Sequence, residues 1–367
     1  MKRIKGIDTI RGLSIFFMCF HIVQWWIRPE DYEEVFYLVV GIVGEIAASG
    51  LLFISGVSAV MLYRNRLAKA KISDAYSIEQ VKNEYLFRAL IILIIAFIFN
   101  SIIAIGTLNP LDIWKWFIPL TIGLSLLLAF PLLKTSKSFR ILLALILWII
   151  HYYLLAVLSP HQGQLNIFGI LYYIFYNSID VHPLIYYFSF FLIGTVIADI
   201  ILDIFLKDNQ EERRLDLKNK FVFPSLIIGP ILVLIGVLFR FPDFLIHITF
   251  SSTVYTLGVF LTIMSVSLII QEFEVIKLQK NYRFFYFYSY YSLTVFFSHY
   301  LLYFIFLEQL NAVNIWIAVV VTFILLTLLI RVIYKKFGPK ASLKVQIGRI
   351  SGILARRVEA KKRNRSI

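Results

Sequence analysis

Three side chains that can exchange or bind a proton lie inside long apolar stretches of this sequence: His21, Glu45 and His299. Ionisable groups at membrane depth are costly, and those that persist usually face a bundle interior or a water-filled cavity. A neutral imidazole can accept a proton near neutral pH, which is the task of a general base in acyl transfer. A lone buried histidine is more often simply hydrogen-bonded, so the chemistry of these residues depends on what surrounds them.

Other ionisable groups in apolar stretches have simpler explanations. Arg88 and Lys115 lie close to the ends of their stretches and can extend their charged groups to the membrane interface. Asp199 and Asp203 approach the inner end of their stretch, so we expect them to reach water as well. His151 and His182 lie toward the outer side and add two more imidazoles there.

The elements that must position these groups are membrane-spanning helices. Apolar residues make up 60% of the chain and charged residues 16%, where a soluble domain would have about 25% charged residues. A helix of about 20 residues crosses a hydrocarbon core of about 30 Å. The sequence predicts an all-α polytopic membrane protein of about ten transmembrane helices, over residues 9–27, 36–63, 85–105, 112–133, 139–158, 183–205, 221–240, 250–271, 284–308 and 313–334.

The basic residues predict how these helices are oriented. Of the 36 Lys and Arg residues, 31 fall at the termini or in alternate loops on one predicted side, whereas the opposite loops contain only Arg28 and Arg240. Cytoplasmic loops carry such an excess of Lys and Arg, so both termini are predicted to be cytoplasmic. The segment 159–182 is the least regular, because its apolar part, residues 165–176, is too short to cross and suits a re-entrant or interfacial segment.

We predict two parts: a single transmembrane domain over residues 1–335, and a basic cytoplasmic tail over residues 336–367. Within the tail, a C-terminal amphipathic helix over 340–358 should lie on the anionic inner leaflet. Its apolar stripe is Leu343, Ile347, Ile350, Leu354 and Val358. The net charge of +14 is therefore an orientation and lipid-contact signal, and does not suggest nucleic acid.

Several chemistries lack their motifs in this sequence. Cys19 is the only cysteine, so an intrachain disulfide and a cysteine-based metal site are both excluded. The sequence also has no Gly-rich phosphate loop, no HExxH motif and no GxSxG motif. We expect no metal. A transporter is disfavoured, because no internal repeat or pair of interrupted helices is evident.

Four segments carry motifs that occur together in one family of membrane enzymes. Their sequences are IDTIRGLSIFFM at 7–18, ASGLLFISGVS at 48–58, DVHPLIYYFSFFLIG at 180–194 and SYYSLTVFFSH at 289–299. In this order they resemble an Asp-x-x-Arg-Gly opening, a Ser-Gly-x-Ser stretch, a Pro-Leu-x-Pro-Trp helix and a late Ser-Leu helix ending in histidine. The chain thus resembles heparan-alpha-glucosaminide N-acetyltransferase and its prokaryotic relatives over predicted spans one to nine.

The resemblance implies an activity and a set of site residues. Members of this family take an acyl group, usually acetyl, from coenzyme A on the cytoplasmic side and deliver it to a sugar on the far side. The implied cosubstrate is acetyl-CoA or another acyl-CoA. The implied catalytic residues are His299, His21 and Glu45, and the implied substrate-binding residues are Asp8, Arg11, Gly12, Ser55, Ser58, Asp180 and His182.

The chain departs from the family pattern at the first histidine. The relatives are expected to have His or Asn eleven positions after the arginine, whereas His21 follows Arg11 by ten. One residue turns a side chain by about 100° on a helix, so either the helix has a local bulge or His21 is not the equivalent group. The family's histidine in the first outer loop has no counterpart, since residues 28–40 contain none, which leaves His299 and His182 as rival general bases.

The resemblance also suggests how the parts would work together. Phosphates of coenzyme A would lie near Arg11, which Asp8 either orients or leaves free by capping the first helix. The base would be His21 or His299, with direct transfer and an acyl-histidine both open. Glu45 could bind the other nitrogen of that histidine. Outer aromatic residues could stack on a sugar or anchor the helices in the interface: Trp25, Trp26, Tyr172 and Tyr173.

A second class of function is compatible with the same buried charges. A non-enzymatic carrier of a lipid-linked sugar or small solute would use them along its substrate pathway. In either case we expect a multi-pass protein of the cell membrane that contacts membrane lipids. It could also be an oligomer, because lipid-facing and partner-facing apolar surfaces have the same composition.

Overall fold

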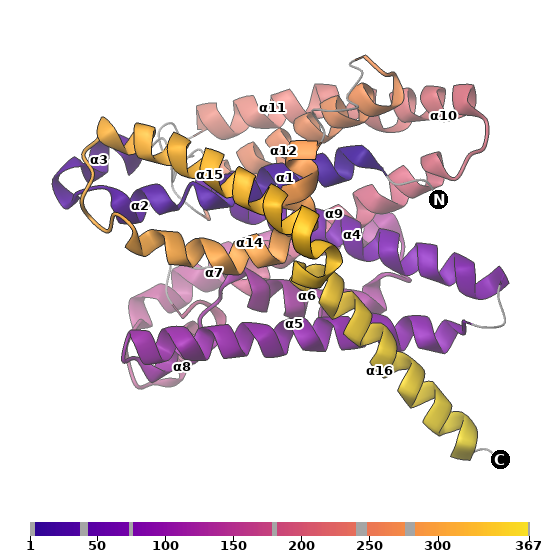
Figure 1. Ribbon diagram of the computed structural model, residues 1–367, viewed down its shortest axis with the longest axis horizontal. Helices are drawn as coiled ribbons and strands as arrows, with labels where there is room; N and C mark the ends of the chain where they lie inside the picture. The colour runs from indigo at the N-terminus through magenta and orange to yellow at the C-terminus, as the bar shows by residue number, and fades with distance from the viewer. Residues whose placement is uncertain are drawn as a thin grey trace. The chain divides into compact units, whose positions relative to one another are not determined.

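The computed structural model describes residues 4–36, 43–72, 76–177, 182–239, 248–275 and 283–365, and its regular elements over these ranges are helices (Figure 1). The α-helices are α1 (Lys5–Cys19), α2 (Ile22–Trp26), α3 (Tyr32–Phe36), α4 (Glu45–Ile72), α5 (Ile78–Gly106), α6 (Ile118–Leu132), α7 (Lys137–Leu158), α8 (Ile167–Phe175), α9 (Leu184–Phe205), α10 (Gln210–Leu217), α11 (Phe223–Phe239), α12 (Phe250–Glu272), α13 (Arg283–Tyr290), α14 (Ser292–Ser298), α15 (Asn314–Phe337) and α16 (Leu343–Arg365). Two 3₁₀ helices matter for the site: η3 (Pro110–Trp114) and η7 (His299–Phe304).

Eight helical segments in the described part of the chain are long and apolar enough to cross a membrane. The all-α polytopic fold predicted from the sequence is therefore confirmed, whereas the count of ten spans and the side of the termini stay predictions. The other two predicted spans, 112–133 and 284–308, contain shorter apolar helices, Ile118–Leu132 and Ser292–Phe304. Arg240, one of the two basic residues predicted for the outer loops, lies outside the described residues.

The first span is irregular at the residue where the sequence spacing departs from the family. Helix α1 ends at Cys19 and α2 begins at Ile22. Between them, the His21 N–H donates to the Met18 carbonyl at 3.2 Å, three residues back instead of four. Such a tightened turn advances side chains by about 120° per residue instead of about 100°, which offsets part of the rotation lost with one residue. The irregularity is a tight turn and not the bulge that was one of the two expectations.

The chain contains two compact units, each with its own core. The first comprises residues 1–51 and 204–346, and the second comprises residues 52–203 and 347–367. In the first unit, α1 packs against α12, α13 and α14, and α11 runs beside α12 (Figure 1). In the second, α5 packs against α6 and η3, and α7 packs against α8. The predicted division into a transmembrane domain and a tail at residue 335 describes a different property from these two compact units and stays a prediction.

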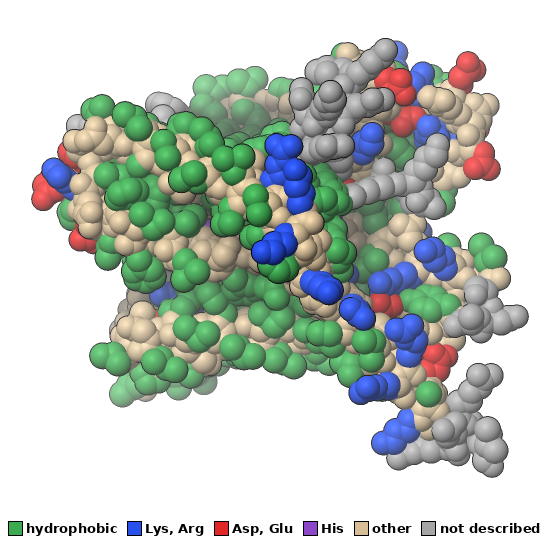
Figure 2. Space-filling view, in the orientation of Figure 1, with side chains coloured by type: hydrophobic (Ala, Val, Ile, Leu, Met, Phe, Trp, Pro, Cys, Tyr) green, Lys and Arg blue, Asp and Glu red, His purple; other side chains and the backbone are tan. Residues whose placement is uncertain are grey.

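Exposed apolar side chains cover the outward faces of the long helices, as expected for surfaces that meet lipid. In α15 they recur every three or four residues, on one side of the helix. They are Ile317, Val320, Val321, Ile324, Leu325, Leu328, Leu329 and Val332. The space-filling view shows the resulting apolar surface in green (Figure 2).

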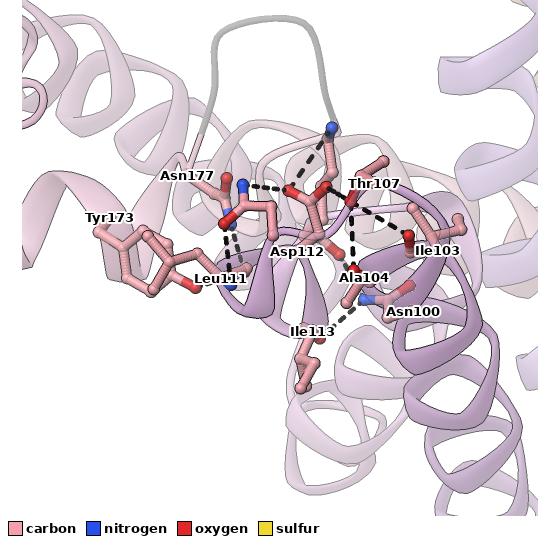
Figure 3. A network of polar contacts seen from close by, with 11 residues as sticks. Asn100, Ile103, Ala104, Thr107, Leu111, Asp112, Ile113, Tyr173 and Asn177 are labelled. Carbon is pink, nitrogen blue, oxygen red and sulfur yellow. Dashed lines mark hydrogen bonds and ion pairs between the residues drawn. The ribbon is translucent and has the colours of Figure 1, made fainter.

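A network of hydrogen bonds connects the C-terminal end of α5 to η3 in the second unit, on the predicted outer side (Figure 3). The buried Asp112 carboxylate accepts from the Thr107 hydroxyl at 2.8 Å and from the Asn109 amide at 3.2 Å. The Asn100 amide donates to the Ile113 and Lys115 carbonyls at 3.0 and 2.8 Å. The two bonds from Asn100 satisfy carbonyls at the end of η3, as a turn at membrane depth requires. Helix α8 is nine residues long, as the short apolar segment predicted.

One expectation about the charged residues is wrong. Asp199 does not reach water: it is fully buried and forms ion pairs with Arg140 and with Arg64, the latter at 2.8 Å. Arg140 is only 1% exposed and also donates to the Thr195 hydroxyl at 3.0 Å. A buried carboxylate is tolerated because these cations compensate the lost hydration. Asp203, one turn later, pairs with Lys137 at 2.5 Å and is exposed, as expected.

Candidate active site

A polar cluster joins α1 to α13 in the first unit. The Arg11 guanidinium donates to the Asp8 carboxylate at 3.0 Å and to the Ser289 hydroxyl at 3.1 Å. The Ser289 hydroxyl in turn donates to the same Asp8 oxygen at 3.0 Å, and Lys344 donates to the Ser289 carbonyl at 2.8 Å. Among the contacts described, this cluster brings two cations, Arg11 and Lys344, together with one carboxylate, Asp8.

Asp8 therefore orients Arg11, which was one of the two roles predicted for it. The N-cap residue is Ile4, whose side chain forms no cap hydrogen bond, and the Gly6 N–H in the first turn donates to the Gln271 side chain at 2.7 Å. Because Asp8 and Arg11 are three residues apart, they share one face of α1. That face is the one that meets Ser289 of α13.

Gly12 brings α1 and α13 close together beside this cluster. A Cβ atom at this position would lie 2.8 Å from the carbonyl carbon of Phe285 and 2.9 Å from its Cα. These distances are shorter than real Cβ contacts allow, so a side chain would force the helices apart. In the structure Gly12 thus has a packing role, and the substrate-binding role that the resemblance implies stays a prediction.

His299 lies at the junction of α14 and η7, and its bonds fix which ring nitrogen carries the proton. It is 1% exposed. Its Nδ1 contacts the Phe296 carbonyl, which can only accept, so Nδ1 carries the hydrogen. Its Nε2 lies 3.0 Å from the Tyr303 hydroxyl, so Nε2 has the lone pair and Tyr303 donates to it. In its neutral form the imidazole therefore presents its basic nitrogen, Nε2, to Tyr303.

The segment after His299 packs against α2 through side chains and backbone. The Trp26 indole donates to the Leu302 carbonyl at 2.8 Å. The Trp25 indole stacks on the Tyr303 ring with a centroid separation of 5.0 Å and an interplanar angle of 12°. Trp25 is 47% exposed, whereas Tyr303 is 7% exposed. Tyr303 therefore lies between the buried base and an accessible aromatic surface.

The polar cluster and His299 lie along the same two segments of the chain, one formed by α1 and α2 and the other by α13, α14 and η7. His21 follows Arg11 by ten residues, and His299 follows Ser289 by ten residues. Ten helical residues span about 15 Å, so the two groups lie at different depths of the first unit. The α1–α13 contact holds one end of the pair and the α2–η7 contact holds the other.

His21 lies beside this second contact. Its Nδ1 is 3.2 Å from the Gln24 amide oxygen, and the two imidazoles are close enough that a charge on His21 would disfavour a charge on His299. The structure thus brings His21 and His299 into one neighbourhood, as predicted from their similar depth. Of the two, His299 is the more buried and has its ring orientation fixed by a backbone carbonyl.

The remaining predicted site residues are not gathered here. Ser55 and Ser58 lie on α4 in the second unit, where the Ser58 hydroxyl donates to the Ile54 carbonyl at 2.5 Å. His182 also belongs to the second unit, and its carbonyl accepts from the Thr121 hydroxyl at 2.7 Å. Asp180 lies outside the described residues. Glu45 begins α4, but its side chain is outside the described part as well.

Sequence reasoning missed three members of this neighbourhood. Tyr303 follows His299 by four residues, the spacing at which helical side chains meet, so its pairing was detectable. Ser289 is the first residue of the late motif and was used only as part of the resemblance. Lys344 was placed with the tail, because nothing in the sequence shows that the tail begins against α13. Over the ranges described, no three His, Cys, Asp or Glu side chains are grouped as metal ligands.

The membrane-length helices and the buried histidine with an ordered tautomer define a multi-pass membrane protein whose buried polar groups suit proton transfer. Residues 3–237 match the catalytic domain of heparan-alpha-glucosaminide N-acetyltransferase. The chain belongs to this family, and with its membrane-length helices it has the catalytic domain of a transmembrane acetyltransferase. No curated protein matches the chain. The match includes Asp8, Arg11 and His21 but ends before Ser289 and His299.

Proposed function

We propose that this protein transfers an acetyl or other acyl group from acyl-CoA on the cytoplasmic side to a sugar hydroxyl or amine on the outer side. The family supports the acetyl transfer, and its name supports a glucosaminide-like acceptor. The observation that carries the site is the buried His299, whose Nδ1 contacts the Phe296 carbonyl and whose Nε2 lies 3.0 Å from the Tyr303 hydroxyl. General bases within hydrogen-bond reach of the moving proton accelerate such reactions by about 10²–10⁴-fold.

Tyr303 determines how His299 reaches the acceptor. The imidazole is buried and its basic nitrogen is bonded to the Tyr303 hydroxyl, so the proton passes through that hydroxyl. The acceptor O–H or N–H gives its proton to the Tyr303 oxygen as the Tyr303 proton moves to Nε2 of His299. The acceptor atom attacks the thioester carbonyl, the C–S bond breaks, and the thiolate takes the proton back through the same path. The products are an acylated sugar and coenzyme A with a free thiol.

This geometry favours direct transfer over an acyl-histidine. A covalent intermediate requires Nε2 to attack the thioester, and in the structure Nε2 is occupied by the Tyr303 hydroxyl at 3.0 Å. A base needs only a proton path, and that hydroxyl provides one. The exposed Trp25 ring, stacked on Tyr303, offers a face for the sugar beside the path.

The donor end of the site is the cluster of Arg11, Asp8, Ser289 and Lys344. Its two cations, Arg11 and Lys344, suit a phosphate of coenzyme A, because cations bind phosphates through short charge-assisted bonds. The distance of about 15 Å between this cluster and His299 lets the donor's flexible arm extend from one to the other. Asp8 and Ser289 hold Arg11 in place on α1.

The test is acyl transfer by purified protein in lipid nanodiscs, followed as release of the coenzyme A thiol from acetyl-CoA with glucosamine as the first acceptor. The variant His299→Gln keeps a polar side chain but removes the basic nitrogen, and we expect kcat to fall by about 10²–10⁴-fold. His161→Gln is the matched control, since the contacts described for the His161 ring are local ones, with the Gln164 amide and the Phe168 ring. Equal activity of the His299 variant and the control would refute the assignment.

A further inference from the structure

Helix α16 presents a basic and apolar face that the acyltransferase site does not use. Successive residues of a helix are turned by about 100°, so residues spaced three or four apart along α16 share one side of it, which faces outward. We define this outward face by Arg349, Ile350, Ile353, Arg356, Arg357 and Lys361. Its four cations are exposed, and so is Ile350 at 45%. The space-filling view shows the basic side chains following one another along α16 (Figure 2).

The opposite side of α16 is packed against the protein, which corrects one part of the sequence analysis. The predicted amphipathic helix is present, but its apolar stripe does not lie on one exposed face. Ile347 is buried together with Ser351 and Ala355, at spacings of four residues, whereas Ile350 and Val358 are exposed. Ile347 of the predicted stripe, together with the small side chains of Ser351 and Ala355, thus forms the face that meets the protein.

The packed face is held at the first turns of α5, in the second unit. A Cβ atom at Gly352 would lie 3.2 Å from the Glu84 carboxylate, and Lys362 pairs with Glu79 at 2.7 Å. Glu84 also pairs with Arg66 and accepts from the Tyr76 hydroxyl at 2.6 Å. Burial and this hydrogen bond raise the pKa of Tyr76 to about 12, so its hydroxyl remains a donor at neutral pH. These contacts fix the rotation of α16 and hence the direction of its outward face.

The charge of the outward face specifies its partner. Glu359 is the only acidic residue in α16, and it lies off the outward face. Apolar side chains among arginines, directly after the membrane-length helix α15, match the boundary between lipid headgroups and acyl chains. We propose that the outward face of α16 binds the phosphate headgroups of anionic phospholipids in the inner leaflet, with Ile350 and Ile353 entering the headgroup layer.

A probe on the outward face tests this binding without using the enzymatic activity. Ile350→Cys can be labelled with a polarity-sensitive fluorophore, because the single native cysteine, Cys19, is buried. The labelled full-length protein is placed in nanodiscs of phosphatidylcholine alone or with about one-third phosphatidylglycerol. We expect a blue-shifted emission and protection from a water-soluble quencher only with the anionic lipid, and a weaker shift at high salt because salt screens exposed charges.

Charge reversal provides the matched comparison. Arg356→Glu with Arg357→Glu should abolish the blue shift, and should weaken the dependence on anionic lipid by about tenfold or more. Lys69→Glu with Lys71→Glu changes the net charge equally at exposed positions of α4, and should leave the probe unaffected.

Three outcomes would overturn the proposal. The first is an emission that does not respond to anionic lipid. The second is an equal shift in pure phosphatidylcholine, which would mean purely apolar contact. The third is a shift in pure phosphatidylcholine nanodiscs on adding soluble polyglutamate, which would indicate an acidic protein as the partner. None of these readouts depends on acyl transfer, so they stand apart from the test of the proposed function.

Discussion

The Tyr303→Phe variant separates a proton path from a packing role. It removes one oxygen, keeps the ring that stacks on Trp25, and leaves Nε2 of His299 as a buried acceptor without its donor. An unsatisfied buried acceptor costs about 1–3 kcal/mol of stability. If Tyr303 carries the proton, kcat should fall by about 10²–10⁴-fold, which corresponds to about 3–5 kcal/mol in the activation barrier. The predicted loss of rate therefore exceeds the predicted loss of stability.

The assay combines steady-state kinetics with a proton inventory, in which kcat is measured in mixtures of light and heavy water. Two protons move together in the wild-type path, so the dependence of kcat on deuterium content should curve. In Tyr303→Phe a single transfer should remain, and the dependence should become linear. The acceptor KM should change little, because the ring that lies beside the acceptor is retained.

Tyr300→Phe is the matched control. Its ring also contacts His299, with a centroid separation of 4.4 Å, but the contacts described for its hydroxyl do not include Nε2. The control should retain a kcat within about threefold of wild type and the curved inventory. Wild-type-like kcat in Tyr303→Phe, or a linear inventory in the wild type, would refute the relay.

Three further variants test the packing and the charges. Gly12→Ala forces α1 away from α13 and should lower the free energy of unfolding by about 1–3 kcal/mol, measured by thermal unfolding. Gly106→Ala should be neutral, because there is open space around the added atom. Equal stability of both variants would contradict the close approach of α1 and α13. Asp199→Asn leaves the buried Arg140 without its counter-charge and should lower the free energy of unfolding by about 3–5 kcal/mol. The exposed Asp203→Asn should lower it by only about 0–1 kcal/mol. A small effect at both sites would show that the ion pairs of Asp199 are hydrated. Trp25→Ala should raise the acceptor KM by roughly tenfold with kcat nearly unchanged, and an unchanged KM would remove the sugar from this surface.

The sequence predicted the class of fold because hydropathy and the distribution of basic residues report directly on helices that cross a membrane. It predicted one uninterrupted span over 284–308, whereas the structure has α13, α14 and η7 in sequence there. The break between α13 and α14 falls within the run Ser289-Tyr290-Tyr291-Ser292, but hydropathy averaged over a whole span does not resolve such a short polar run. The change to a 3₁₀ helix coincides with the bond between the His299 ring and the Phe296 carbonyl, which hydropathy does not register.

The charged residues also show that contacts between residues far apart in the chain could not be predicted from the sequence. Asp199 was assigned to the interface from its distance to a helix end, but its partner Arg140 is 59 residues away in sequence. Only tertiary packing reveals such a pair, because a helix end in sequence need not be a helix end in water. By contrast, Asp8 and Arg11 are on the same turn region of one helix, so their pairing was among the predicted alternatives.

The bond between the His299 ring and the carbonyl of Phe296, three residues earlier, has a consequence for divergence. The aim of the imidazole is set inside a single turn, by a backbone atom that every substitution preserves. Loops that contact the sugar could therefore be exchanged, lengthened or recoded over generations while the proton acceptor keeps its direction. A lineage built on this chain would be able to change what it modifies before it had to change how it reacts.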